Sequence, residues 1–209
     1  MNIYKFHSNP DELIGHTSRN FYFGDEAKEL ILQGKEVTKV IGTLYLDGTA
    51  ITALPDNLTV QGALYLSDTP ITALPDNLTV HGTLYLNDTP ITALPDNLTV
   101  HEDLNLMRTP ITALPDNLTV QGALYLKRTQ ITALPDNLTV HGTLDLSGTP
   151  IRSLPDNLTV HGTLNLTDTP ITALPDNLKV SGHLWINSTP NLDKDNLPSS
   201  LVVNGEIYK

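Results

Sequence analysis

Cysteine is absent from the 209-residue chain, and large aromatic residues are scarce, with one Trp and three Phe. Without cysteine the chain cannot form a disulfide framework, a zinc–thiolate site or a cysteine nucleophile. Basic residues are also few: 12 Lys and Arg stand against 23 Asp and Glu, for a formal net charge of −11. A protein that follows nucleic-acid phosphates needs a basic face, so we expect no direct nucleic-acid binding.

Long hydrophobic runs are missing as well. No stretch approaches the roughly 18 consecutive apolar residues of a membrane span, so we expect no membrane association. The first residues, from Met1 to His7, lack the apolar run of a signal peptide, which favours a cytoplasmic protein. Apolar residues still make up 39% of the chain, too many for a disordered acidic tail, and the length suits one continuous array.

A repeat dominates the sequence. The ten residues from Ile51 to Val60 recur almost unchanged at intervals of 20 residues, a period too short for a pair of helices. Each repeat is therefore expected to form one coil of a solenoid. Apolar and polar residues alternate over 58–66, which predicts a strand, and prolines mark the other half as an extended or turning return segment. The expected core of each coil is Leu58, Val60, Leu64, Leu66, Ile71 and Leu74.

These patterns predict a β-rich solenoid: a leucine-rich-repeat-like, right-handed stack of about nine coils with one parallel sheet and a short helical N-terminal cap. The cap covers 1–36, the tandem repeats cover 37–190, and a capping repeat covers 191–209. Within the cap, one helix is expected to begin at Asn9-Pro10 and a second to run from Asp25 to Gln33.

The repeat motif resembles a known family. Leu-Pro-x-x-Leu followed by Leu-x-Leu-x-x-Thr-x-Ile-x-x-Leu-Pro, over about 37–207, is similar to the bacterial 20-residue leucine-rich repeats of the YopM/IpaH effector type. Thr69 and its equivalents replace the family's Asn ladder, and Val-x-Gly precedes Leu64, so a plain parallel β-solenoid is an alternative. The resemblance implies a recognition surface in a bacterial effector or a phage-encoded inhibitor of a host defence protein. The related ubiquitin ligases add a catalytic cysteine domain, which a chain without cysteine cannot supply.

Motifs for catalysis or cofactor binding are missing, so we expect no enzyme, no cofactor and no small-molecule substrate. Repetition places His and Asp on neighbouring coils without any catalytic purpose, at His101, Asp103, His141 and Asp145. Histidine pairs on adjacent coils supply two ligands each, fewer than a metal site needs, so we expect no metal: the pairs are His81 with His101 and His141 with His161.

One acidic residue per repeat forms a column: Asp56, Asp76, Asp96, Asp116, Asp136, Asp156 and Asp176. The turn chemistry of Pro-Asp-Asn accounts for this column. Calcium bridging or an acidic edge that mimics DNA are the functional alternatives.

The repeats differ from one another mainly at the outward strand positions and the two residues after each strand. Tyr, Trp, Met and Arg occur there, and these residue types are enriched in the cores of protein interfaces. The alternative is that surface positions tolerate change and that Tyr favours strands. The predicted partner-binding residues are Tyr45, Tyr65, Tyr85, Asn105, Met107, Arg108, Tyr125, Lys127, Arg128, Asp145 and Trp185.

The sequence thus predicts a non-enzymatic scaffold that binds a partner protein through its strand face. An acidic decoy that mimics DNA and occupies a nucleic-acid-binding protein is the alternative. A solenoid hydrolase acting on glycans fits the sequence least well.

Overall fold

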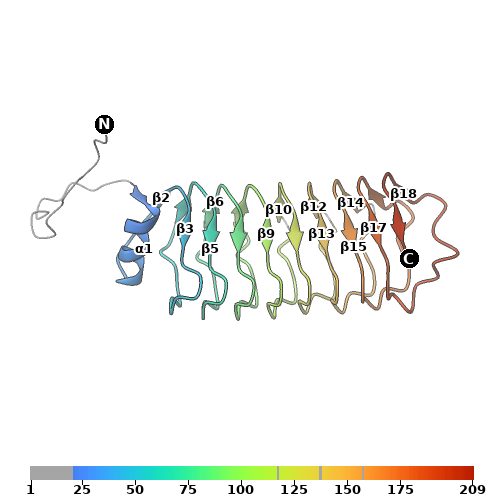
Figure 1. Ribbon diagram of the computed structural model, residues 1–209, viewed down its shortest axis with the longest axis horizontal. Helices are drawn as coiled ribbons and strands as arrows, with labels where there is room; N and C mark the ends of the chain where they lie inside the picture. Colours follow the sequence, from blue (N-terminus) through green and yellow to red (C-terminus); the bar gives the residue numbers. More distant parts are fainter. Residues whose placement is uncertain (1–20, 117, 137, 157) are drawn as a thin grey trace, which may run out of the picture.

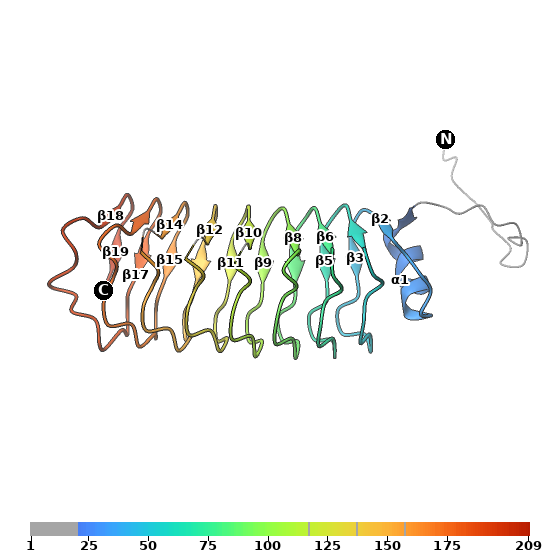
Figure 2. The same cartoon turned by 180° about the vertical axis from the view of Figure 1, so that it is seen from behind.

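The computed structural model describes residues 21–116, 118–136, 138–156 and 158–209. These residues confirm the predicted parallel solenoid: nine coils stack along one axis, with the helical cap at one end and the C-terminus at the other (Figures 1 and 2). Strands in neighbouring coils pair in parallel, and within the regular repeats paired residues lie 20 positions apart, as in Thr59 with Thr79.

The described coils form two parallel sheets rather than the single sheet that we expected. Sheet A has ten strands: β1 (Tyr22–Phe23), β2 (Lys39–Ile41), β4 (Thr59–Val60), β6 (Thr79–Val80), β8 (Thr99–Val100), β10 (Thr119–Val120), β12 (Thr139–Val140), β14 (Thr159–Val160), β16 (Lys179–Val180) and β18 (Val202–Val203). Sheet B has nine: β3 (Leu44–Tyr45), β5 (Leu64–Tyr65), β7 (Leu84–Tyr85), β9 (Leu104–Asn105), β11 (Leu124–Tyr125), β13 (Leu144–Asp145), β15 (Leu164–Asn165), β17 (Leu184–Trp185) and β19 (Ile207–Tyr208).

A glycine corner separates the two sheets. The strand predicted over 58–66 is divided near Gly62, where the chain turns from sheet A to sheet B. A Cβ atom on Gly62 would lie 2.7 Å from the carbonyl carbon of Gly42 in the preceding coil, so glycine at this position lets the two coils approach closely. Glu102 is the exception in this column, and Gly122 still donates a backbone hydrogen bond of 3.1 Å to its carbonyl.

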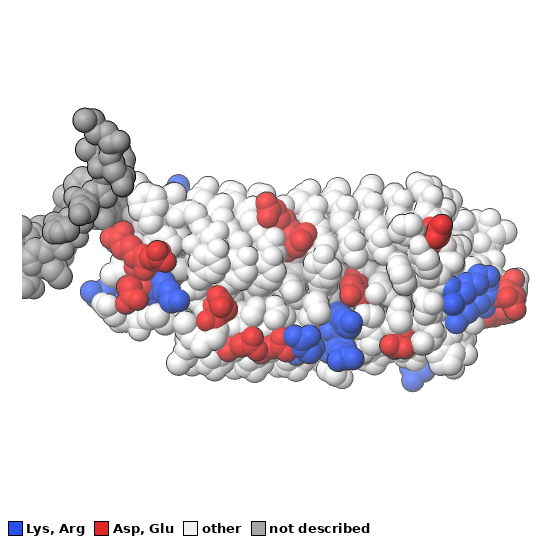
Figure 3. All heavy atoms as spheres, viewed as in Figure 1, with Lys and Arg blue, Asp and Glu red and all other residues white. Residues whose placement is uncertain are grey.

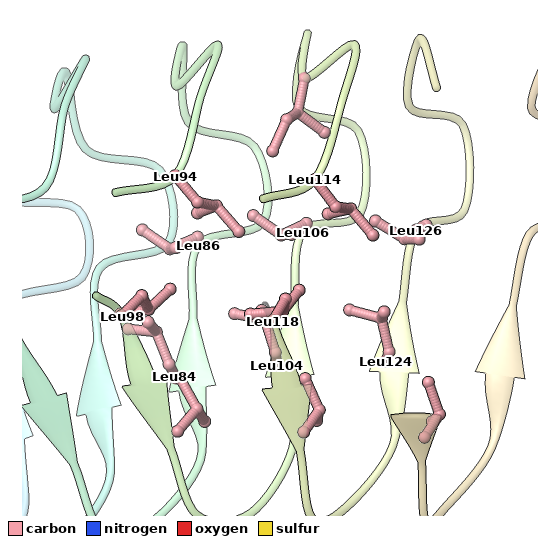
Figure 4. Packing of buried hydrophobic residues seen from close by; sticks show 14 of the residues in the cluster. Leu84, Leu86, Leu94, Leu98, Leu104, Leu106, Leu114, Leu118, Leu124 and Leu126 are labelled. Atoms are coloured by element: carbon pink, nitrogen blue, oxygen red, sulfur yellow. The ribbon is translucent and has the colours of Figure 1, made fainter. Parts of the chain in front are cut away.

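The predicted core is confirmed. Five of its side chains are fully buried in the coil that contains Leu58, and Leu74 is only 8% exposed. Equivalent leucines from successive coils stack on one another through the middle of the solenoid (Figure 4). Each fully buried leucine contributes about 1.5–3 kcal/mol relative to exposure, and a single coil has no neighbour to bury its leucines against.

A threonine closes the turn that follows each strand of sheet B except β19, the last one. Thr69 is buried, and its hydroxyl donates a 2.7 Å hydrogen bond to the carbonyl of Leu66. Between them, Asp68 has a φ of 57°, in the left-handed region. The same hydroxyl bond, 2.6 to 2.8 Å long, recurs at Thr49, Thr69, Thr89, Thr109, Thr129, Thr149, Thr169 and Thr189.

The cap contains α1 (Gly24–Leu32), which confirms the predicted second helix; the helix predicted from Asn9 lies outside the described residues. Ala27 and Ile31 bury one face of α1, which packs beside the first coil. The helix ends at Leu32, and Gly34 follows with a φ of 71°, which lets carbonyls of the last turn accept hydrogen bonds from the amides of Gly34 and Lys35. The preceding strand β1, which the repeat pattern does not predict, extends sheet A by pairing with β2.

Candidate functional site: the outer face of sheet B

The outer face of sheet B begins with a stack of three tyrosines. Tyr45, Tyr65 and Tyr85 come from paired positions in β3, β5 and β7. Ring centroids lie 4.8 Å apart for Tyr45 and Tyr65 and 4.4 Å apart for Tyr65 and Tyr85, with interplanar angles of 22° and 15°. Burial in the stack is the main cause that raises the pKa of Tyr65. The stack is a preformed aromatic surface, and Tyr45 is 52% exposed at its end.

A second aromatic pair lies at the other end of the face. Trp185 and Tyr208 stack with a centroid distance of 4.2 Å and an interplanar angle of 22°. Tyr208 was not among the predicted site residues. The signal for it was present, because Ile207-Tyr208 occupies the place of Leu184-Trp185 in the next coil.

Tyr125 stands between the two clusters without an aromatic neighbour on the adjacent strands. Its partners in the sheet are Asn105 and Asp145. Burial raises the pKa of Tyr125, and the charges of Asp103 and Asp145 add to the effect. The structure therefore places Tyr85 and Tyr125 on one face but does not bring them into contact.

The polar residues at the positions equivalent to Tyr65 accept hydrogen bonds from backbone amides two residues further along the chain. The side-chain oxygen of Asn105 accepts a 3.1 Å hydrogen bond from the amide of Met107, and Asp145 does the same for Ser147 at 2.9 Å. Both side chains are half-buried. These predicted binding residues thus lie on the face, but part of their hydrogen-bonding capacity closes a local turn.

Basic residues gather near the middle of the face, with acidic residues on either side of them (Figure 3). We call Arg108, Lys127 and Arg128 the basic cluster. Arg108 donates hydrogen bonds of 2.5 Å from Nε and Nη2 to the carboxylate of Asp88. Among the described residues Lys127 and Arg128 have no such partner, so they are the free cations of the cluster.

The two arginines of the cluster occupy a restrained backbone position. Arg108 and Arg128 have φ angles of 57° and 58°, where six other coils have Gly, Asp or Ser. A bulky residue in this left-handed region costs about 1–2 kcal/mol. Turn chemistry favours small residues here, so the stability of the turn does not explain the arginines.

A groove of about 330 Å³ lies beside the basic cluster, towards the C-terminal coils. It is formed by positions from four successive coils, and its lining residues are Lys127, Arg128, Ser147, Gly148, Asn165, Thr167, Asp168, Trp185 and Asn187. Three predicted site residues, Lys127, Arg128 and Trp185, meet at this groove.

The histidine column lies at the corner between the two sheets, and the aspartate column lies on the turn that precedes sheet A. His81 stacks on His101 at 4.6 Å, and His141 stacks on His161 at 5.2 Å. Within the described ranges, no group of three His, Asp or Glu residues is arranged to hold a metal ion. The column that begins at Asp56 is exposed on the turn edge and forms no ion pair with any described residue.

In the part of the chain that the structure describes, no helix has the length and apolar character needed to cross a membrane. Comparison of the sequence with protein-family models and with curated proteins found no match.

Proposed function

We propose that this protein is a non-enzymatic scaffold that binds a partner protein through the outer face of sheet B. One observation carries the proposal: over six successive, near-identical coils the outward residue of sheet B changes while the outward residue of sheet A does not. Sheet B presents Tyr, Asn, Asp and Trp along one column. Sheet A presents threonine in six successive coils, at Thr59, Thr79, Thr99, Thr119, Thr139 and Thr159. Unselected variation of surface residues would have altered the outward columns of sheet A and sheet B to a similar extent, because both columns belong to the same repeats.

The chemistry of the face fits this role. The tyrosine stack offers rigid aromatic area, which binds with a small loss of side-chain entropy. The basic cluster supplies charge that attracts an acidic partner to an otherwise acidic molecule. A bacterial effector or a phage-encoded inhibitor of a host protein, acting in the cytoplasm, is the setting we propose, and it depends on the resemblance of the repeat motif alone.

A photo-crosslinking residue tests the proposal directly. It would replace Tyr125 on sheet B in one variant and Thr99 on sheet A in a matched control. In a bacterial lysate, we expect a discrete protein adduct from position 125 and none from position 99. Adducts from position 99 alone, or from neither position, would contradict the proposal.

The acidic decoy is the second candidate, and the exposed aspartate column favours it. The dependence of binding on ionic strength distinguishes the decoy from the tyrosine-anchored interface. A decoy complex held by this column should weaken steeply between low and physiological ionic strength, whereas an interface anchored by tyrosines should change little.

A further inference from the structure

The groove beside the basic cluster exists because one coil lacks a side chain. In the column that contains Arg128, the next coil has Gly148 and the one after it has Asp168. A Cβ atom at Gly148 would lie 3.2 Å from Cγ of Arg128, so the stem of Arg128 leans over the glycine into the gap. The groove therefore has a guanidinium at one end and a carboxylate at the other.

The floor of the groove has unused hydrogen-bonding capacity. Ser147 is only 6% exposed, and its hydroxyl has no hydrogen-bond partner. The equivalent Ser67 is satisfied, because its hydroxyl donates a 2.7 Å hydrogen bond to Oδ1 of Asn87 in the next coil. The coil after Ser147 has Thr167, not Asn, at the position of Asn87.

A second unpaired atom lies beyond Thr167. Oδ1 of Asn187 is buried without a partner, although its amide nitrogen donates a 3.1 Å hydrogen bond to the carbonyl of Lys209. Buried polar atoms without partners are uncommon in folded proteins and each costs about 1–3 kcal/mol. Two such atoms belong to residues that line this one groove, which gives its lining hydrogen-bonding capacity that the protein itself does not use.

We propose that this groove binds an extended segment of the partner protein that carries a carboxylate and, about three residues away, an ammonium or guanidinium group. The carboxylate would lie between Lys127 and Arg128, which have no acidic partner among the described residues. The cation would face Asp168. Two coil steps separate Arg128 from Asp168, about 9.6 Å at the usual strand spacing, and an extended chain covers this distance in about three residues. A turn of Ser147 about χ1 would bring its hydroxyl to the bound backbone.

Trp185 gives a direct signal for occupancy, because it lines the groove and is the only tryptophan of the chain. The probe is the blocked peptide acetyl-Gly-Glu-Ala-Ala-Lys-Gly-amide, titrated against the full chain. We expect a saturable change in Trp185 fluorescence. Replacing the glutamate of the peptide by glutamine, or its lysine by glutamine, should weaken binding in each case.

Two variants of the groove serve as independent tests. Gly148→Asp introduces the residue that three other coils have at this left-handed position, and its carboxylate would lie one coil from Arg128, as Asp88 lies one coil from Arg108. Lys127→Ser with Arg128→Gly converts this coil to the Ser-Gly pair of the next one. Each variant should weaken peptide binding at least about tenfold, since each removes the charged contact.

A matched control removes two positive charges elsewhere. Arg152→Thr with Lys179→Thr restores residues that most coils carry at those positions, and peptide binding should be unchanged. Thermal unfolding followed by circular dichroism checks that every variant is folded. No saturable change in the wild type would overturn the inference, as would binding by both groove variants that is as tight as binding by the wild type. An equal response to inorganic phosphate at the same concentration would reduce the site to a simple anion site and also overturn it.

This inference depends on the proposed function, but the two can fail separately. If the peptide does not bind while substitutions of the tyrosines abolish partner binding, the groove assignment alone is wrong. If the peptide binds while those substitutions leave partner binding intact, the tyrosines are not the anchors of the interface and that part of the proposed function is wrong.

Discussion

Arg108 holds the carboxylate of Asp88, in the preceding coil, through two hydrogen bonds of 2.5 Å. The side chains of Arg108 and Asp88 are 46% and 27% exposed, and the pair joins two coils on the surface of sheet B. Arg108, a residue of the proposed binding face, therefore also contributes to the interaction between neighbouring coils.

The first prediction concerns the titration of Asp88. Hydrogen bonds from Arg108, and then from Asn87, hold the pKa of Asp88 below its ordinary value of 3.8. Because the pKa is lower in the folded state, the pair stabilises the protein above the unfolded-state pKa, and this contribution is lost as the pH falls through the folded-state pKa. Arg108→Gln should therefore raise the pKa of Asp88, measured by NMR titration of its carboxyl carbon.

The same variant should melt at a lower temperature than the wild type at neutral pH. The difference should shrink below about pH 4 and vanish once Asp88 is protonated in both proteins. Arg152→Gln is the control, because Arg152 has no acidic partner among the described residues. A difference that persists unchanged in acid would show that Arg108 acts through packing rather than through the carboxylate.

The second prediction concerns the shared core. Leu104 is fully buried in β9, while Thr99 is exposed in β8 of the same coil. Leu104→Ala should lower the free energy of unfolding by about 2–5 kcal/mol, because it leaves a cavity between three coils. Thr99→Ala should lower it by less than about 1 kcal/mol. Chemical denaturation measures both, and equal losses would refute the assigned register.

The third prediction concerns the glycine corner. A Cβ atom at Gly142 would lie 2.6 Å from the carbonyl carbon of Gly122. Gly142→Ala should therefore push neighbouring coils apart and cost about 1–3 kcal/mol of stability. Thr143→Ala, at the next residue, is the control and should cost less. A Gly142→Ala variant as stable as the control would mean that the coils are not held at this spacing by the corner.

The core and the coil stack follow from the sequence because they depend on periodicity alone. Apolar residues such as Leu64 and Ile71 recur every 20 residues, and stacking is the arrangement that buries them all. The division into two sheets was missed because the alternation of inward and outward residues continues through Gly62. The corner results from the close approach of two coils, which no single repeat reveals.

The sequence predicts which residues of the candidate site line up on successive coils, but it does not predict which side chains bond to one another. The tyrosine stack follows from identical residues at paired positions. By contrast, the side chain of Asn105 accepts a hydrogen bond from the amide of Met107, and the side chain of Arg108 donates one to Asp88. These partners depend on local geometry. The groove depends on Gly148 lying between Arg128 and Asp168, an arrangement that appears only when three coils are stacked.

The last prediction concerns partner binding at the face as a whole. Tyr85 stacks on Tyr65, whereas Tyr125 has no aromatic neighbour on the adjacent strands, so their contributions should be separable. Replacing both Tyr85 and Tyr125 with Ser should weaken partner binding by roughly 2 kcal/mol or more, because interface energy concentrates in large, well-packed side chains. Folding should persist, since both side chains point outward from sheet B. The partner identified by crosslinking is purified on its own, and calorimetric titration with it measures the loss of binding free energy.

The matched control for this prediction replaces Asp96, Asp116 and Asp136 with Asn on the turn edge. These residues are exposed on the turn edge, away from the outer face of sheet B, and their replacement removes three negative charges without altering that face. Binding should stay almost unchanged. If this triple variant abolished binding while the tyrosine variant retained it, the acidic edge would be the interface and the decoy function would hold. The tyrosines would then serve only to pack one strand of sheet B against the next.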